Sequence, residues 1–492
     1  MDTKSEFEST ETPEVPVWDD NSLDPLKWSP KKKNLILAVM CYMSFLTDFL
    51  AGIGVPMMLP QSKEWGISLV DAARSMTGNT FTQGIGSLIA VPFAQRYGYL
   101  PVMFWSTLAT VLLTMVCAVV PTWIGFVAVR ILQGFFSTAA QVLGLTIIQE
   151  IYFFEEKVSK INIWGWSVLV GPYAGPFISS FMLRSLTWRE AFWMFSGFVA
   201  VGLIAIIVMM EETAYDRETP TNNPDRPAGH WKRKMYSLIG ITGSRMKGRK
   251  TLLQGSMEVW RVFIQPQFLL VWLFHGLTYC WSVGINGTLV TFITPPVSKG
   301  GYGFDTTALG LIYLSPIIAV ITGEILGHFI NESLQQRTIR RLKGRFSPES
   351  RLIALVPSVL SMCFGISLLG WALWLHWHWF AVALFWAIFV CAAMCSTVVI
   401  SAYLLDCFPN DSVPVAALLN FTRVMFGFLV PIFQKDWSSA VGASWSFTTQ
   451  GIICVVVYGL VVVVQLKGAE WRKKTDMCPD EIIVKRVDSI ES

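Results

Sequence analysis

The sequence is poor in charge and lacks the common motifs of soluble catalysis. Only 15% of its 492 residues are charged, whereas about a quarter are charged in a typical soluble domain. It contains no phosphate-binding P-loop, no H-x-x-x-x-D motif and no G-x-S-x-G nucleophile elbow. The missing P-loop argues against an ATP-driven pump, and the other absences argue against a membrane-bound enzyme.

Cysteine spacing and net charge exclude two further classes. No pair among the nine cysteines has metal-ligand spacing in a polar loop. We therefore expect the cysteines to act as small apolar residues of helices, and we expect no metal and no cofactor. A net charge of +4 is too small to indicate a nucleic-acid partner. The acidic, polar N-terminus carries no signal peptide, so the first apolar run is expected to serve as the insertion signal.

Long apolar runs dominate the chain. The sequence is 53% hydrophobic with a mean hydropathy of +0.50, and a membrane-spanning helix needs roughly 20 mostly apolar residues. The runs are continuous, without the alternation of barrel strands, which predicts an all-α polytopic membrane protein with twelve transmembrane helices. We expect these spans near 34–59, 71–95, 99–119, 122–146, 160–183, 190–210, 267–294, 306–330, 351–375, 379–405, 412–434 and 444–466.

Lysine and arginine placement predicts the orientation of these spans. Basic clusters lie before the first span, between the sixth and seventh, after the eighth and after the last, whereas the alternate loops carry few. Because cytoplasmic loops are enriched in Lys and Arg, both termini and the long central loop are expected to be cytoplasmic. The predicted organisation is a disordered tail, a six-helix half, a central loop, a second six-helix half and a tail, at 1–33, 34–210, 211–266, 267–466 and 467–492.

The two halves also show weak internal similarity. Small residues from Gly86 precede a polar turn at Gln95 to Gly98, and small residues from Gly323 precede a charged turn at Glu332. Repeated halves of this kind are typical of transporters.

Three motifs then resemble the major facilitator superfamily over about residues 30–466. Arg96 and Gly98 match its G-x-x-x-D-R-x-G-R-R loop, although Gln95 replaces the acid and Tyr99 and Leu100 replace the basic pair. The other two motifs are R-x-x-Q-G at Arg130, Gln133 and Gly134, and G-P-x-x-G-G at Gly171, Pro172 and Gly175, where Pro176 replaces the last Gly. The departures at 95, 99 and 100 imply a weakened charge relay between the halves.

The resemblance extends to one branch of this family. The span-5 motif is similar to that of the drug:proton antiporters, and the stretches Asp24–Trp28 and Glu212–Arg217 look like fungal members. That group contains drug and secondary-metabolite exporters as well as uptake carriers for polyamines. It implies that the span-4 arginine, here Arg130, takes part in proton coupling and that the span-5 motif is linked to antiport.

Ionisable groups inside spans are candidates for transport chemistry, because each costs about 2.5–3.5 kcal/mol to insert. Asp48 in the first span can take a proton or pair with a cationic substrate. Arg130 can tune it or simply pair with it. Gln133 and Gln141 extend the polar face of Arg130.

The second half supplies the remaining candidates. Glu324 is expected either in the cavity or near the cytoplasmic surface. His275 and Asn286 lie on one polar stripe. His275 would either titrate near neutral pH or take part in hydrogen bonds between helices. Asn420 and Arg423 share a face, where Arg423 would bind an anion or pair with Asp406.

The sequence thus favours a secondary transporter, with a small-molecule substrate, protons and the lipid bilayer as partners. The leading hypothesis is proton-coupled efflux of a small amphiphilic compound, driven by the proton gradient. The transporter is expected to be a monomer in the plasma membrane. The alternative is proton-coupled uptake of an organic cation such as a polyamine.

Overall fold

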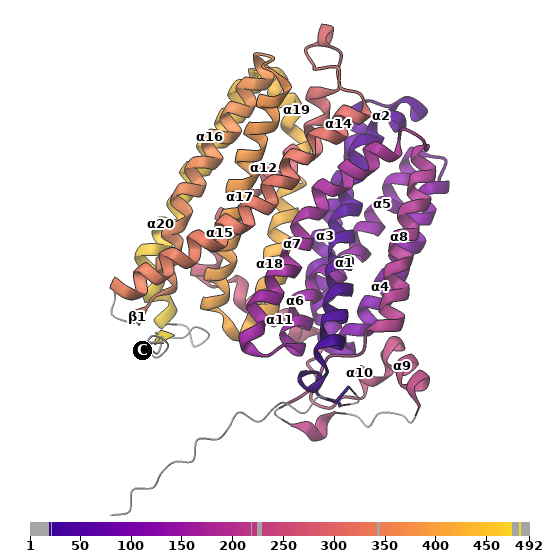
Figure 1. Ribbon diagram of the computed structural model, residues 1–492, viewed down its shortest axis with the longest axis vertical. Coiled ribbons are helices and arrows are strands. Elements are labelled where there is room, and N and C mark those ends of the chain that lie inside the picture. The colour runs from indigo at the N-terminus through magenta and orange to yellow at the C-terminus, as the bar shows by residue number, and fades with distance from the viewer. Residues whose placement is uncertain are drawn as a thin grey trace, which may run out of the picture.

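The computed structural model describes residues 19–20, 22–217, 219–223, 229–341, 345–474 and 482–483. Within them the chain forms twelve long helical rods, packed as two six-rod halves that lie side by side (Figure 1). The twelve-span, all-helical fold expected from the sequence is confirmed. Residues 1–18 of the predicted N-terminal tail lie outside the described residues.

Several rods are interrupted, so the twelve rods comprise more than twelve helices. Those of the first half are α1 (Pro30–Gly52) with α2 (Gly54–Trp65), α3 (Leu69–Tyr97), α4 (Tyr99–Val119), α5 (Trp123–Ser137) with α6 (Ala139–Ile151), α7 (Phe154–Met182) and α8 (Trp188–Met209). Those of the second half are α12 (Pro266–Thr288) with α13 (Val290–Ile293), α14 (Thr306–Ile312) with α15 (Leu314–Arg341), α16 (Leu355–Trp374), α17 (Trp379–Cys407), α18 (Ser412–Gly427) with α19 (Val430–Val441) and α20 (Ala443–Lys473).

Ten of the twelve rods are long and apolar enough to cross a membrane by length and composition. The 29-residue helices α3 and α7 are the two that are not. Helix α3 carries the polar series Thr77, Asn79, Thr80, Thr82 and Gln83, and α7 starts with charged residues. Both lie against the other half of the molecule, where side chains meet protein as well as lipid, which is why low hydropathy does not disqualify them.

Prolines account for three of the breaks. Pro56, Pro316 and Pro431 each lack the N–H that would bond four residues back, to Gly52, Ile312 and Gly427. The interruptions fall immediately after those three residues, between α1 and α2, α14 and α15, and α18 and α19.

Within each half, glycines let helices approach backbone to backbone. A Cβ on Gly171 would lie 2.7 Å from the Phe45 carbonyl oxygen, and one on Gly175 would lie 2.5 Å from that of Phe49. Such distances are shorter than any real contact, so only glycine fits where α7 crosses α1. Glycines play the same part at the crossing of α3 with α5 (Gly86, Gly134) and of α15 with α17 (Gly323, Gly327).

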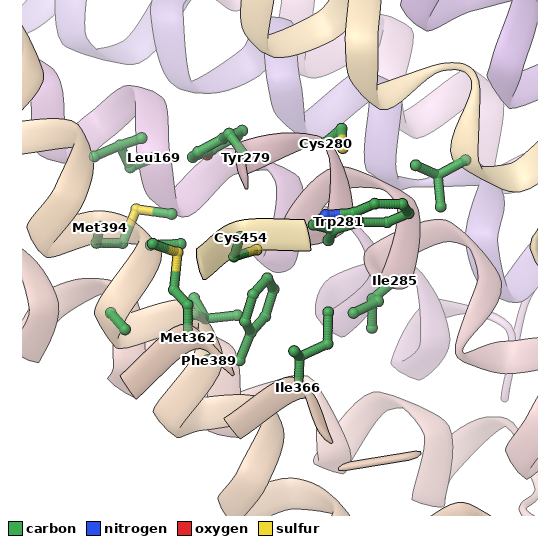
Figure 2. Packing of buried hydrophobic residues seen from close by; sticks show 14 of the residues in the cluster. Leu169, Tyr279, Cys280, Trp281, Ile285, Met362, Ile366, Phe389, Met394 and Cys454 are labelled. Atoms are coloured by element: carbon green, nitrogen blue, oxygen red, sulfur yellow. The ribbon is translucent and has the colours of Figure 1, made fainter. Parts of the chain in front are cut away.

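The buried cysteines belong to this packing. Cys280 and Cys454 lie among Trp281, Ile366 and Phe389 in the core of the second half (Figure 2). Among the described residues no group of His, Cys, Asp or Glu could hold a metal ion.

The segment 211–265 joins the halves at one end of the bundle, called here the linker end. It contains α9 (His230–Ile239), α10 (Ile241–Ser244) and α11 (Leu252–Phe263), so the predicted loop includes three helices. The prediction of a disordered tail up to residue 33 is wrong for its described part. A 3-10 helix spans Pro25–Lys27, Trp28 is fully buried and α1 starts at Pro30.

The C-terminal tail also begins later than expected. Helix α20 runs to Lys473, beyond the predicted end of the last span. Beyond it, the strand β2 (Ile482–Ile483) pairs antiparallel with β1 (Arg345–Phe346), the described strands of the chain. The rest of the predicted tail, apart from Lys474, lies outside the described residues.

Candidate functional site

A small cavity lies between the two halves, in the middle of the bundle. Its volume is about 70 Å³, room for a few water molecules and far less than the ~300–1,000 Å³ of a typical ligand site. Helices α1, α3 and α7 of the first half and α12, α18 and α19 of the second supply its wall. The polar wall residues are Asp48, Thr77, Thr80, Gln83, Tyr173, Tyr279, Ser282, Asn286 and Arg423.

An ion pair joins the halves at this cavity. The Arg423 guanidinium of α18 donates to Asp48 Oδ2 of α1 over 2.7 Å, and both side chains are almost fully buried. Gln141 donates to the same oxygen over 2.8 Å, and Arg423 also donates to Asn420 Oδ1 over 3.0 Å. Four candidates predicted separately from the sequence therefore form one cluster.

The partners of both arginines differ from the sequence-based hypotheses. Arg130 does not pair with Asp48, and Arg423 does not pair with Asp406. Asp406 instead forms an ion pair with Arg351, 2.5 Å away, within the second half. Sequence spacing does not reveal such partners, since Asp48 and Arg423 lie 375 residues apart along the chain.

Arg130 is buried inside the first half and bonded to neutral groups. It donates to the carbonyl oxygens of Leu50 and Ala51 in the last turn of α1 and to Gln133 Oε1, at 3.1, 3.5 and 2.6 Å. The partial negative charge at a helix C-terminus favours a cation there. Gln133 continues the network to Thr114 over 2.6 Å. Arg130 therefore fastens α5 to α1 without contacting the second half.

The remaining predicted site residues lie around or apart from the cluster. Asn286 lines the cavity and donates to the Pro172 carbonyl of α7 over 3.1 Å. His275 is buried one turn from Tyr279, with ring centroids 5.3 Å apart, but is not part of the cavity wall. Glu324 is buried on α15, 3.2 Å from His328 of its own helix, and the structure does not bring it into the cavity.

Several cavity residues were missed by the sequence analysis. Tyr173 of α7 and Ser282 of α12 share a hydrogen bond of 2.8 Å between the halves. Gln83 of α3 donates to the Thr47 carbonyl beside Asp48. The signal was present in the sequence, because the hydroxyls and amides of α3 recur at helical spacing inside a predicted span.

The glycine motif in α7 lies directly behind Asp48. A Cβ on Gly171 would come within 3.1 Å of the Asp48 Cβ. Gly52 on α1 faces Pro172 and Pro176 in the same way, at 2.6 and 2.8 Å. Because α7 and α1 are in direct contact here, the motif determines how close the Asp48 carboxylate lies to α7.

The loop motif between α3 and α4 is held by a carboxylate from the linker segment. Gly98 has a φ of +109°, and the Glu212 carboxylate accepts the backbone N–H groups of Tyr99 and Leu100 at the start of α4. Gln95 donates weakly to Glu258 of α11 over 3.4 Å, and Arg96 is half-buried in the last turn of α3. Glu332 is exposed on α15 and bonds Gln336 of its own helix.

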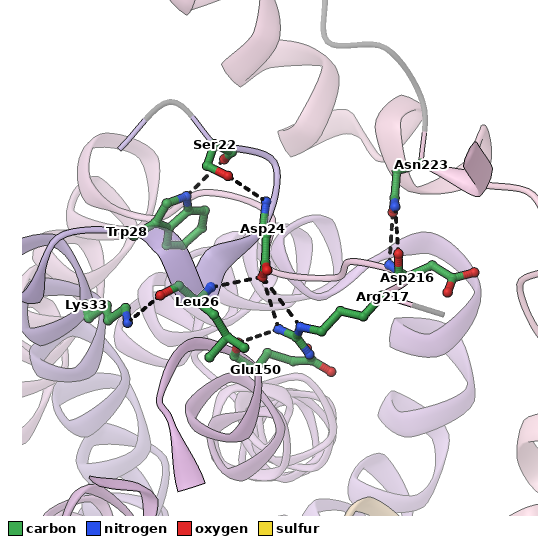
Figure 3. A network of polar contacts seen from close by, with 9 residues as sticks. All are labelled: Ser22, Asp24, Leu26, Trp28, Lys33, Glu150, Asp216, Arg217 and Asn223. Atoms are coloured by element: carbon green, nitrogen blue, oxygen red, sulfur yellow. Dashed lines mark hydrogen bonds and ion pairs between the residues drawn. The ribbon is translucent and has the colours of Figure 1, made fainter. Parts of the chain in front are cut away.

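The two stretches that look fungal meet at the linker end (Figure 3). Arg217 binds Glu150 at the end of α6 over 2.8 Å and Asp24 of the N-terminal segment over 3.5 Å. Nearby, Gln149 accepts a hydrogen bond of 2.6 Å from Ser412 of the second half. The halves therefore touch at the linker end.

The halves also touch at the opposite end. A Cβ on Gly310 of α14 would lie 2.8 Å from the Ser180 Cβ of α7. Contacts between the halves therefore occur towards both ends of the bundle as well as at the cavity.

Comparison with known proteins shows which family this architecture resembles. A model of the Major Facilitator Superfamily matches residues 37–431. The Efflux pump radE of Floropilus chiversii is 23% identical over 92% of this chain and 84% of that protein. The Multidrug transporter FLR2 of Candida glabrata is 22% identical over 94% of this chain and 78% of that protein.

Solved structures share the fold at low identity. The human organic anion transporter MFSD10 superposes with a TM-score of 0.57 at 16% identity, covering 88% of this chain and all of that one. The proton:xylose symporter XylE of E. coli gives 0.60 at 14% identity, covering 89% and 96%.

Proposed function

Because the chain belongs to the major facilitator superfamily, and is thus an integral membrane transporter of small molecules, we propose that it exports a small amphiphilic organic compound in exchange for protons. Transport would proceed by alternating access in a monomer of the plasma membrane. The termini and the linker end would face the cytoplasm. The halves 34–210 and 267–466 would be the moving units.

The Asp48–Arg423 pair carries this proposal. A buried carboxylate that faces a buried guanidinium across the two halves attracts it only while ionised. Protonation of Asp48 removes that attraction and frees the halves to separate. Loss of the proton restores the ion pair, which draws the two halves together and closes the cavity again.

Arg423 and Gln141 hold the carboxylate in place for this exchange. Both donate to Asp48 Oδ2, so a proton arriving at Asp48 competes with the guanidinium for the charge of the same carboxylate. Arg130, bonded to α1 backbone just beyond Asp48, keeps that part of the helix fixed while the pair forms and breaks.

The cavity wall suits an amphiphile. Tyr173, Tyr279 and Phe428 offer ring surfaces, while Thr77, Thr80 and Ser282 offer hydroxyls. The names of the relatives radE (an efflux pump) and FLR2 (a multidrug transporter) support export. Among the wall residues Asp48 is the single carboxylate and already has a cationic partner, a poor counter-ion set for a polyamine.

The test is transport into proteoliposomes that contain the purified full-length protein and a panel of fluorescent amphiphilic dyes. Exchange predicts dye accumulation when the lumen is more acidic than the outside, abolished by a protonophore. Accumulation driven by the opposite gradient would indicate proton-coupled uptake and overturn the proposal. Dye movement that ignores the pH gradient would remove proton coupling.

A further inference from the structure

Two helices of the linker segment each expose a stripe of large apolar side chains. On α9 these are Trp231, Met235 and Ile239, which are 72%, 52% and 51% exposed. On α11 they are Leu253, Met257 and Trp260, with Ile264 directly after the helix, and these are 73%, 59%, 58% and 52% exposed. Spacings of three and four residues put each set on one helix face.

The opposite face of each helix is packed against the bundle. On α9, Lys234 is buried and donates to the carbonyl oxygens of Val208 and Met210, where α8 ends. On α11, Val259 and Val262 are buried, and a Cβ on Gly255 would lie 3.1 Å from that of Pro92 in α3. Each stripe therefore points away from the protein.

Both helices lie beside the ends of long apolar helices. Towards the ends of α8 and α3, Val208 and Phe93 are apolar side chains that are 62% and 43% exposed. Helix α11 is also separated from the spanning helix α12 by only Ile264 and Gln265. The stripes thus continue the lipid-facing surface of the bundle.

The surroundings of the stripes are strongly basic. Residues 229–264 contain eight Lys and Arg residues against one acidic residue, Glu258. The exposed basic residues of this stretch are Lys232, Arg245, Lys247, Lys250 and Arg261.

We propose that α9 and α11 lie in the headgroup region of the adjoining leaflet and bind anionic phospholipid there. Apolar stripes with Trp, flanked by Lys and Arg, are the pattern of helices that rest in a membrane interface. Basic residues at that depth attract anionic headgroups. This inference rests on the membrane fold and on neither the direction nor the coupling of the proposed transport.

The first experiment places the photo-crosslinking residue p-benzoylphenylalanine at Leu253 or Met257 in the full-length protein. The protein is held in nanodiscs of equal phosphatidylcholine and phosphatidylserine, and adducts are weighed by mass spectrometry. Lipid adducts are expected at both sites, with phosphatidylserine in at least twofold excess. Gln254 and Ser256, exposed between stripe residues, are the matched control positions and should give several-fold fewer.

Charge removal then separates headgroup binding from apolar insertion. Lys232→Gln, Arg245→Gln and Lys247→Gln together should bring the two lipids to equal yield while total lipid adducts persist. Arg337→Gln with Lys473→Gln, exposed basic residues elsewhere on the chain, should leave the excess unchanged. Equal adducts at stripe and control positions, or adducts only to other protein chains, would overturn the proposal.

Discussion

The contacts within each half and the contacts between the halves are built differently. Inside a half, helices cross on glycines, backbone against backbone, as where Gly171 and Gly175 of α7 meet α1. Between the halves, apolar side-chain contacts such as Phe81–Phe428 are joined by buried polar bonds, such as Asp48–Arg423 and Tyr173–Ser282. A backbone crossing has one arrangement, whereas a polar bond can be exchanged for another partner or for water. The halves are therefore suited to move as rigid bodies.

The buried arginines illustrate the same difference. Arg130 is satisfied entirely inside the first half, by carbonyl oxygens and Gln133. Arg423 belongs to the second half and takes its carboxylate from the first. A motion that separates the halves leaves Arg130 unchanged and breaks the pair of Arg423.

The largest effect is expected when the cross-half pair is broken. Asp48→Asn should abolish transport driven by a pH gradient, because no proton can be carried, and leave Arg423 buried without a counter-charge. An uncompensated buried charge costs about 3–5 kcal/mol, measurable as a lower melting temperature in detergent. Adding Arg423→Gln should recover stability but not coupling.

A within-half ion pair provides the control for that prediction. Asp406→Asn breaks the pair with Arg351 inside the second half and should leave gradient-driven transport intact. Wild-type coupling in Asp48→Asn would contradict the assignment of Asp48.

The next effect concerns the glycine crossing. Gly171→Ala forces a methyl group to within 2.7 Å of the Phe45 carbonyl oxygen, and overpacking of this kind costs about 1–3 kcal/mol. Gly165→Ala on the same helix meets nothing within 4 Å and should be neutral or slightly stabilising. Thermal unfolding of both variants measures the difference, and equal melting temperatures would argue against a tight crossing.

A smaller effect is expected from one hydrogen bond between the halves. Tyr173→Phe removes the bond to Ser282, worth about 1 kcal/mol, and should raise the open population about fivefold. The readout is the reaction rate of a cysteine placed at Thr80 in the cavity wall. Tyr313→Phe removes a bond to the Asn286 carbonyl within the second half and should leave that rate unchanged.

The smallest effect is expected at Lys234 of α9, which is bonded to the end of α8 in the first half. Burial beside the end of α8 lowers the pKa of Lys234 from 10.5 to about 8. The folded protein thus binds fewer protons here than the unfolded chain between pH 8 and 10.5, so stability from this group rises with pH across that window. Comparing the melting temperature of Lys234→Met at pH 7.5 and 9.5 should show a smaller rise than wild type. An equal rise would show that Lys234 is ionised normally.

Hydropathy was sufficient to predict a bundle of long helices, because lipid imposes a strong and simple constraint on every span, and the family motifs added the facilitator fold. The two rods that are not apolar enough to count as spans, α3 and α7, both pack extensively against the other half. Asp48, Gln141, Asn420 and Arg423 could be selected one by one as costly intramembrane groups. Their pairing could not, since it depends on how α1 and α18 face each other in three dimensions.

The linker segment was the least predictable region. Its composition indicated a polar loop, yet α9 and α11 are ordered by contacts with α8 and α3 that no local pattern encodes. The bond from Gln95 to Glu258 likewise appears only where α11 settles on α3.

The separation between glycine crossings and cavity wall has an evolutionary consequence. Thr77, Thr80 and Ser282 line the cavity but take no part in the backbone crossings. Under the proposed function, substitutions there would change which compound is accepted while the framework of the halves stays intact. A lineage of such proteins would then diversify its cargo at little risk to folding, starting from the same pair of rigid halves.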